Sequence, residues 1–154
     1  MTIEAREIMR QPVVTAGPDD SVRVVAQRLS DHAISALPIC DADGRPLGMI
    51  SEGDLMRPFT SGRMLKRAWW LELLAEGNSL APDFEEYLRV DRRHARDLMI
   101  QPVVTAEEGT SVAEIAEMME KHKIKRVPIL RDGKVVGIVS RADIIRALAG
   151  GALL

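Results

Sequence analysis

The sequence predicts a mixed α/β (α+β) fold in which two β-α-β-β-α repeats pack with pseudo-two-fold symmetry and a helical insertion separates them. Three observations predict this fold: an internal repeat, the same order of elements in both copies, and the composition of an ordinary folded domain. The hexapeptide QPVVTA at residues 11–16 recurs letter for letter at residues 101–106. The correspondence continues in order through Ser21, His32, Pro38, Ser51 and Asp54 in the first copy and Ser111, His122, Pro128, Ser140 and Asp143 in the second. An ordered match of this length indicates a tandem duplication.

The second copy shows the order of its elements most clearly. Ser111 followed by Glu114 is the pattern of a capping box at the start of a helix. Asp132-Gly133 between two apolar runs predicts a hairpin, and Gly150-Gly151 allows the left-handed residue that ends many helices. The predicted elements are a short helix at 94–99, strands at 103–105, 126–130 and 134–139, a helix carrying Val112, Ile115, Ala116 and Met119 on one face, and a last helix at 141–149.

The first copy repeats this order, with Ser21 as a helix N-cap, a hairpin at 41–45 and a last helix broken by Pro58. We therefore divide the chain into a first repeat at 1–58, a helical insertion at 59–96 and a second repeat at 97–154. A unit of about 50 residues buries too little surface to be stable alone. The two copies are expected to pack sheet against sheet, with clefts where they meet.

The insertion is not low in complexity, and it holds both tryptophans of the chain. Its pattern predicts one helix at about 62–76 and a second that starts near Pro82 and carries Phe84, Tyr87 and Leu88 on one face. We expect this apolar surface to cover the protein's own core. Sealing a dimer is the second alternative, and docking a partner is the third.

Composition excludes several classes of protein. The formal net charge is −2, so nucleic acid and anionic membranes are not expected partners. The single cysteine, Cys40, excludes an internal disulfide and a zinc cluster built from cysteines of one chain. The first residues lack the apolar stretch of a signal peptide, and no run approaches the roughly 20 apolar residues of a membrane helix. A cytoplasmic protein is the expectation.

The segments from Gly48 to Asp54 (GMISEGD) and from Gly137 to Asp143 (GIVSRAD) follow an Asp-Gly hairpin in each copy. With the opening Met-x-Gln-Pro-Val-Val-Thr and the central Ile-x-x-Leu/Val-Pro-Ile, they give a pattern that resembles the tandem cystathionine β-synthase (CBS) domain family, or Bateman module. The resemblance covers residues 7–57 and 97–148. It implies a regulatory module that commonly forms homodimers, with adenine nucleotides bound in clefts between the repeats.

The resemblance also implies roles for equivalent residues of the two copies. Asp54 and Asp143 would accept hydrogen bonds from ribose hydroxyls, and Ser51 and Ser140 would lie near the phosphates. The chemistry suits these roles, because a helix N-terminus attracts anions and a carboxylate offers two oxygens to a diol. The same Ser-x-x-Asp pattern is also an ordinary helix cap that needs no ligand, and both interpretations can hold together.

Two further groups complete the predicted site. Basic residues near the proposed phosphate position occur in the second copy and are replaced by Ser35, Ala36 and Glu52 in the first, so the Asp143 site is the better anion site. In these modules each cleft draws residues from both copies, so those bases can also serve the other cleft. The basic residues in question are Lys125, Arg126 and Arg141.

The second group is an apolar slot for adenine, which is predicted from Val14, Thr15, Leu37, Pro38, Val104, Thr105, Val127 and Pro128.

The sequence contains no catalytic or metal-ligating pattern. Cys40 ends an apolar strand, where a buried thiol is expected, and His32 and His122 are equivalent helix-end residues. We expect a non-enzymatic ligand sensor that requires no cofactor, with AMP, ADP, ATP, an NAD-type dinucleotide or S-adenosylmethionine as effector. Two other functions stay open: a dimerisation or partner-docking module with empty clefts, and the regulatory subunit of an enzyme complex.

Overall fold

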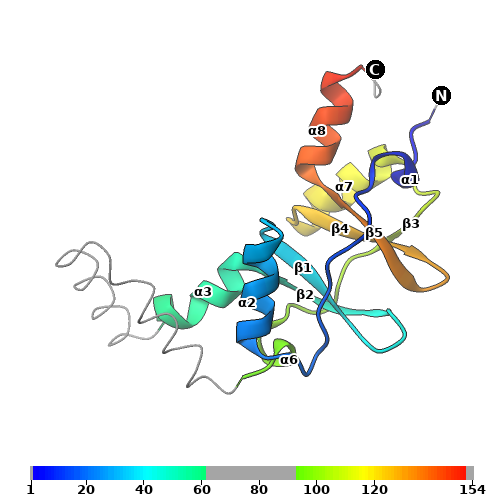
Figure 1. Cartoon of the computed structure of the whole chain (residues 1–154). Helices are drawn as coiled ribbons and strands as arrows, with labels where there is room; N and C mark the ends of the chain where they lie inside the picture. The colour runs from blue at the N-terminus through cyan, green and yellow to red at the C-terminus, as the bar shows by residue number, and fades with distance from the viewer. Residues whose placement is uncertain (1, 62–92, 152–154) are drawn as a thin grey trace. The chain divides into compact units, whose positions relative to one another are not determined.

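The computed structural model describes residues 2–61 and 93–151, with side chains described outside 57–61 (Figure 1). The predicted helices of the insertion lie outside these residues. The chain divides into two compact units, and neither is continuous in sequence. The C-terminal unit comprises residues 1–15, 40–47 and 101–154, and the N-terminal unit comprises residues 16–39 and 48–100.

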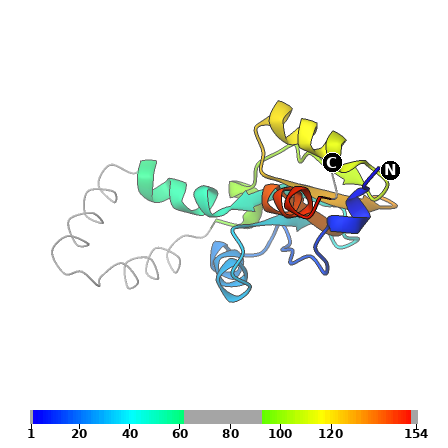
Figure 2. The same ribbon diagram turned by 90° about the horizontal axis from the view of Figure 1, so that it is seen from above.

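The C-terminal unit contains a three-stranded sheet in the order β3-β4-β5, with β3 parallel to β4 and β4 antiparallel to β5. Its strands are β3 (Ala106–Glu107), β4 (Arg126–Arg131) and β5 (Lys134–Ser140). Helix α7 (Val112–His122) packs near β4, and α8 (Arg141–Ala149) continues directly from β5; Figure 2 looks along α8 with α7 beside it. The buried core of this unit is formed by Ala5, Ala106, Ile115, Met119, Val127, Ile129 and Val139.

The N-cap at Ser111 and the Asp-Gly hairpin predicted for the second copy are confirmed. Ser111 Oγ accepts a hydrogen bond from the Glu114 backbone N–H at 3.1 Å, as expected of an N-cap. Asp132 and Gly133 form the two-residue turn between β4 and β5 with φ values of 53° and 80°, the positive values that a type I′ hairpin requires. The glycine that adopts positive φ after α8 is Gly151, at 82°.

The strand predicted at 103–105 is wrong. These residues have no regular structure, and β3 begins only at Ala106, which pairs with Ile129 of β4. The run of β-branched residues favoured a strand, but strand propensity is weak beside the pairing that the rest of the sheet allows.

The N-terminal unit repeats this arrangement in a reduced form. Strands β1 (Ala36–Cys40) and β2 (Pro46–Ser51) form a two-stranded sheet, of which residues 40–47 at the hairpin end are assigned to the C-terminal unit. A single parallel bridge from Ala16 to Ile39 stands where β3 pairs with β4 in the other unit. Helices α2 (Val22–Asp31), α3 (Glu52–Ser61) and α6 (Ala95–Leu98) complete it. Val25, Leu37, Ile39 and Ile50 are fully buried in this unit.

The predicted break at Pro58 is also wrong, because α3 continues to Ser61. Proline lacks only its own N–H, so the helix loses the bond to the carbonyl four residues earlier while its other backbone bonds remain available. The proline therefore weakens this helix without ending it.

The short helix that precedes each repeat belongs to the unit of the other repeat. Helix α1 (Ala5–Ile8) packs in the C-terminal unit, where the backbones of Arg10 and Ile138 exchange hydrogen bonds of 2.9 and 3.1 Å. Helix α6 packs in the N-terminal unit, where Ile100 and Met49 exchange hydrogen bonds of 2.8 and 3.2 Å. Each lead-in segment thus extends the sheet edge of the repeat to which it does not belong in sequence.

A glycine permits this close approach in both units. A Cβ atom on Gly137 of β5 would lie 2.7 Å from the Cγ of Met9, and a Cβ on Gly48 of β2 would lie 2.9 Å from the Cγ of Met99. Real Cβ atoms do not come so close to neighbouring atoms. The absence of a side chain at these two positions lets the lead-in methionines lie directly on the strand.

Among the helices that the structure describes, none has the length and apolar character needed to span a bilayer.

Candidate functional site

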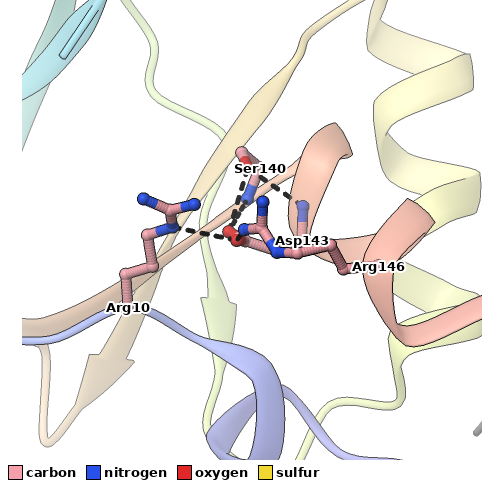
Figure 3. Close-up of polar contacts among 4 residues, drawn as sticks. All are labelled: Arg10, Ser140, Asp143 and Arg146. Atoms are coloured by element: carbon pink, nitrogen blue, oxygen red, sulfur yellow. Dashed lines mark hydrogen bonds and ion pairs between the residues drawn. The ribbon is translucent and has the colours of Figure 1, made fainter. Parts of the chain in front are cut away.

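Asp143 lies at the start of α8 and is almost completely buried. Its Oδ2 accepts hydrogen bonds from the Ser140 backbone N–H at 2.8 Å and from the Ser140 hydroxyl at 2.9 Å (Figure 3). The Ser140 Oγ in turn accepts the Asp143 backbone N–H at 3.2 Å. These reciprocal bonds form a capping box, so the Ser-x-x-Asp pattern acts as a helix cap in this structure.

Two arginines occupy the other oxygen of the same carboxylate. Arg10 Nε donates to Asp143 Oδ1 at 2.9 Å, and Arg146 Nη2, one turn further along α8, donates to the same atom. The Asp143 side chain is 4% exposed, whereas those of Arg10 and Arg146 are 61% and 58% exposed. Figure 3 shows the two guanidinium groups beside the carboxylate. The result is a buried carboxylate with a mostly solvent-exposed basic rim.

The environment of Asp143 lowers its pKa. Burial acts to raise the pKa of this carboxyl, but the hydrogen bonds from the Ser140 backbone, Arg10 and the Ser140 hydroxyl, together with the charge of Arg10, outweigh that effect. All of these contacts favour the ionised form. At neutral pH the site therefore presents a carboxylate, which only accepts hydrogen bonds.

Asp54 occupies the equivalent place at the start of α3 and is equally buried. Its Oδ2 accepts the Ser51 backbone N–H at 2.8 Å and the Ser51 hydroxyl at 3.1 Å, and its own backbone N–H lies 3.4 Å from Ser51 Oγ. At the position equivalent to Arg10 the chain has Ile100, which has no side-chain donor, whereas the position equivalent to Arg146 is again an arginine, Arg57. The two caps are alike, and they differ in sequence at the residue equivalent to Arg10.

The predicted phosphate residues of the second copy fall into two groups. Lys125 and Arg141 line a hollow of about 320 Å³ between α7 and α8, and the Arg141 backbone N–H donates to the Lys125 carbonyl at 3.0 Å. Arg126 begins β4 directly opposite Ser140 on β5. The hollow is completed by Ala116, Met119, Glu120, Lys123, Ile124, Ile144 and Ile145.

The residues predicted to hold adenine are distributed over both units. Leu37 and Pro38 lie in β1 of the N-terminal unit, and Val127 and Pro128 lie in β4 of the C-terminal unit; all four are fully buried. These four side chains therefore belong to the buried cores of their units in this structure. Val14, Thr15, Val104 and Thr105, which belong to the C-terminal unit, are half-buried and retain accessible surface.

Cys40, His32 and His122 lie at the ends of β1, α2 and α7. Cys40 is buried at the end of β1, and burial, assisted by the negative charge of Asp41, raises the pKa of its thiol to about 11. A protonated, buried thiol is a poor nucleophile. His32 Nδ1 lies 3.1 Å from the Arg28 carbonyl oxygen at the end of α2, and His122 is exposed at the end of α7. Within residues 2–61 and 93–151, no group of three or more His, Cys, Asp or Glu side chains is placed to hold a metal ion.

Sequence reasoning missed Arg10 and Arg146. The spacing of three residues between Asp143 and Arg146 on a predicted helix was a usable signal, because side chains at i and i+3 are neighbours. Arg10 is 133 residues from Asp143 in the chain, so only the tertiary placement of the lead-in segment reveals this contact.

Comparison with known proteins agrees with this architecture. The family profile for the CBS domain matches residues 5–60 and 95–150. Hypoxic response protein 1 of Mycobacterium tuberculosis is 29% identical over 150 residues, which are 97% of this chain and 88% of that protein. An uncharacterized protein of Methanopyrus kandleri is also 29% identical, over 94% of this chain, but the chain spans only 62% of that relative's length.

Solved structures support the same assignment. The CBS domain pair of protein MJ0100, in complex with 5′-methylthioadenosine and S-adenosyl-L-methionine, superposes with a TM-score of 0.72 at 26% identity, covering 98% of this chain and 99% of that one. The predicted mixed α/β fold with tandem repeats is thereby confirmed. With both repeats matched by the family profile, the chain belongs to the CBS domain family.

Proposed function

We propose that this protein is a non-enzymatic regulatory module that senses an adenosine-containing nucleotide. The observation that carries the proposal is the buried, ionised Asp143 at the start of α8, with its basic rim of Arg10 and Arg146. A carboxylate accepts the two hydroxyls of a ribose, and arginine binds phosphate through parallel hydrogen bonds. Support also comes from the CBS pair of MJ0100, a relative at 26% identity whose structure holds two adenosine compounds.

The residue roles follow the chemistry of the two copies. Asp143 and Asp54 are the proposed ribose acceptors, and the half-buried Val14, Thr15, Val104 and Thr105 are the proposed adenine contacts. Phosphate is proposed to lie near Ser140, Arg141, Arg126 and Lys125 in the second copy and near Ser51 in the first. The positions equivalent to Arg10 and Arg141 are Ile100 and Glu52 in the Asp54 site, whereas the equivalent of Arg146 is again an arginine, Arg57, so the Asp143 site has more basic residues and is the proposed stronger site.

Nucleotide binding is expected to raise the melting temperature of the protein. A ligand that binds only the folded state stabilises it by about 2.7 kcal/mol when its concentration is one hundred times its dissociation constant. Differential scanning fluorimetry with AMP, ADP, ATP and NAD at millimolar concentration measures the shift. An unchanged melt with all four ligands would favour the alternative of a dimerisation module with empty clefts.

In isothermal titration, Asp143→Ala should weaken binding about tenfold to a hundredfold, and Asp54→Ala should weaken it less.

The protein is also expected to form a homodimer. Ile145 and Leu148 of α8 are 62% and 42% exposed, which is unusual for large apolar side chains on one short helix. A second copy that covers this face removes the apolar surface from water. Sedimentation equilibrium at micromolar concentration should give twice the chain mass of 17.0 kDa, and Ile145→Asp should shift the population toward monomer. Monomer alone in the unsubstituted protein would contradict the prediction.

The alternative of a regulatory subunit within an enzyme complex has a different signature. A catalytic partner would co-purify with the chain at a fixed ratio, and nucleotide would alter the activity of that partner. Affinity purification followed by mass spectrometry of both proteins and released small molecules distinguishes this alternative from a sensor that acts alone.

A further inference from the structure

The hydrogen-bonding capacity of the Asp143 carboxylate is fully used. A carboxylate has about four lone-pair positions, two on each oxygen. Oδ2 receives the backbone N–H and the hydroxyl of Ser140, and Oδ1 receives Arg10 and Arg146. A ribose diol that binds to this carboxylate must therefore displace at least one of these four donors.

The donors that give way are the arginines. The Ser140 groups are part of the capping box and cannot leave without opening the first turn of α8. Arg10 and Arg146 reach the buried carboxylate from side chains that are more than half exposed, so each can rotate into solvent without disturbing the core. Oδ1 is thus the position where ligand and protein compete.

The cost of that displacement depends on what the ligand brings. A displaced guanidinium that returns to water loses a charge-assisted hydrogen bond, whereas one that meets a phosphate forms an equivalent bond. In a nucleoside 5′-phosphate the phosphate is separated from the ribose ring by one methylene, so a diol on Asp143 brings the phosphate near the side chains flanking the carboxylate. An uncharged thioether at the same carbon offers no such partner, and a sulfonium would be repelled by both arginines.

We propose that Arg10 and Arg146 make the Asp143 site selective for 5′-phosphorylated adenosine over uncharged or cationic adenosine derivatives, by transferring from the carboxylate to the ligand phosphate. This inference rests on the proposed nucleotide-sensing function. The CBS pair of MJ0100 holds 5′-methylthioadenosine and S-adenosyl-L-methionine, which are an uncharged and a cationic derivative of the kind that this site is proposed to disfavour. Selectivity is assigned to the Asp143 site, where two arginines contact one carboxylate oxygen; the Asp54 site has Ile100 at the position equivalent to Arg10 and an arginine, Arg57, at the position equivalent to Arg146.

Isothermal titration with AMP, 5′-methylthioadenosine and S-adenosylmethionine tests the inference on the full chain. The unsubstituted protein should bind AMP at least about tenfold more tightly than either of the other ligands. Arg10→Gln should weaken AMP binding about tenfold and leave 5′-methylthioadenosine binding unchanged or stronger, because one competitor for Oδ1 is gone. Arg146→Gln should act in the same direction, and Arg10→Lys, which keeps the charge, should retain part of the preference.

The matched control is Arg131→Gln. Arg131 is an arginine of the same unit with a similarly exposed side chain, and it pairs with Glu108. Its loss should change none of the three affinities. Thermal melts of all variants without ligand show whether each remains folded at the titration temperature.

The outcomes separate this inference from the function on which it rests. If none of the three ligands binds, the sensor function itself fails. If 5′-methylthioadenosine or S-adenosylmethionine binds as tightly as AMP, the sensor function stands and the selectivity is overturned. Equal weakening of AMP and 5′-methylthioadenosine by Arg10→Gln would also overturn it, since that result assigns Arg10 a purely structural role.

Discussion

Replacing Asp143 with alanine is expected to lower the free energy of unfolding by about 2–4 kcal/mol at neutral pH, with the protein still folded. The change removes the acceptor for the Ser140 backbone N–H and hydroxyl and for Arg10 and Arg146. Loss of a helix cap costs about 1 kcal/mol, and hydrogen bonds to a charged group add about 1.5–3 kcal/mol, reduced here because both arginines are largely in water. Urea denaturation measures the loss.

Glu117→Ala is a suitable control, because Glu117 is an exposed acidic residue of α7 in the same unit. Its substitution should change the free energy of unfolding by less than about 0.5 kcal/mol. A loss at Asp143 no larger than that of the control would show that the capping box and the arginine contacts contribute nothing to stability.

The contribution of Asp143 should also depend on pH with a defined sign. Its pKa in the folded state is lower than in the unfolded chain, where it is about 3.9, so the ionised carboxylate stabilises the fold above that value. The stabilisation is lost as the pH falls through the folded-state pKa. The difference in unfolding free energy between the unsubstituted protein and Asp143→Asn should therefore be constant from pH 5 to 7 and shrink below about pH 4. A difference that grows on acidification would contradict the assignment.

Gly137→Ala is expected to destabilise the C-terminal unit by about 1–3 kcal/mol, the usual cost of overpacking. The new Cβ would lie 2.7 Å from the Cγ of Met9, so either the Met9 side chain or the lead-in segment that carries it must shift away from β5. Alanine is otherwise acceptable in a strand, and the backbone of Gly137 does not have a positive φ. Thermal unfolding gives the loss, and hydrogen exchange at the Arg10 and Ile138 amides, which pair across this contact, shows where the structure opens.

A second substitution tests the cause. Met9→Ala shortens the side chain that the new Cβ would meet, so the double variant with Gly137→Ala should recover part of the loss relative to the sum of the single variants. Gly109→Ala is the control, because its Cβ would meet only the end of the flexible Arg6 side chain at 3.4 Å. Strict additivity of the two single changes would rule out the Met9 contact as the cause.

The sequence by itself determined the features that depend on neighbouring residues. The duplication was readable from the repeated hexapeptide, and the serine caps at Ser111 and Ser140 follow from short-range hydrogen bonding that the local pattern specifies. The turn at Asp132 and Gly133 was predictable for the same reason, since these residue types tolerate the positive φ values of the hairpin. The failures were also local: β-branched residues at 103–105 and a proline at 58 indicated preferences that are too weak to decide a strand or a helix end.

The tertiary structure alone decided which segments meet. Nothing in the order of residues indicates that α1 packs in the unit of the second repeat, because the pairing of Arg10 with Ile138 depends on a free strand edge and on the missing side chain of Gly137. That placement brings Arg10 to Asp143, which is 133 residues away in the sequence. The carboxylate that caps α8 therefore also accepts hydrogen bonds from two arginines, and its hydrogen-bonding capacity is fully used. Caps depend on atoms a few residues apart, whereas this charge cluster depends on packing between distant segments, and a single sequence carries no direct signal for such contacts.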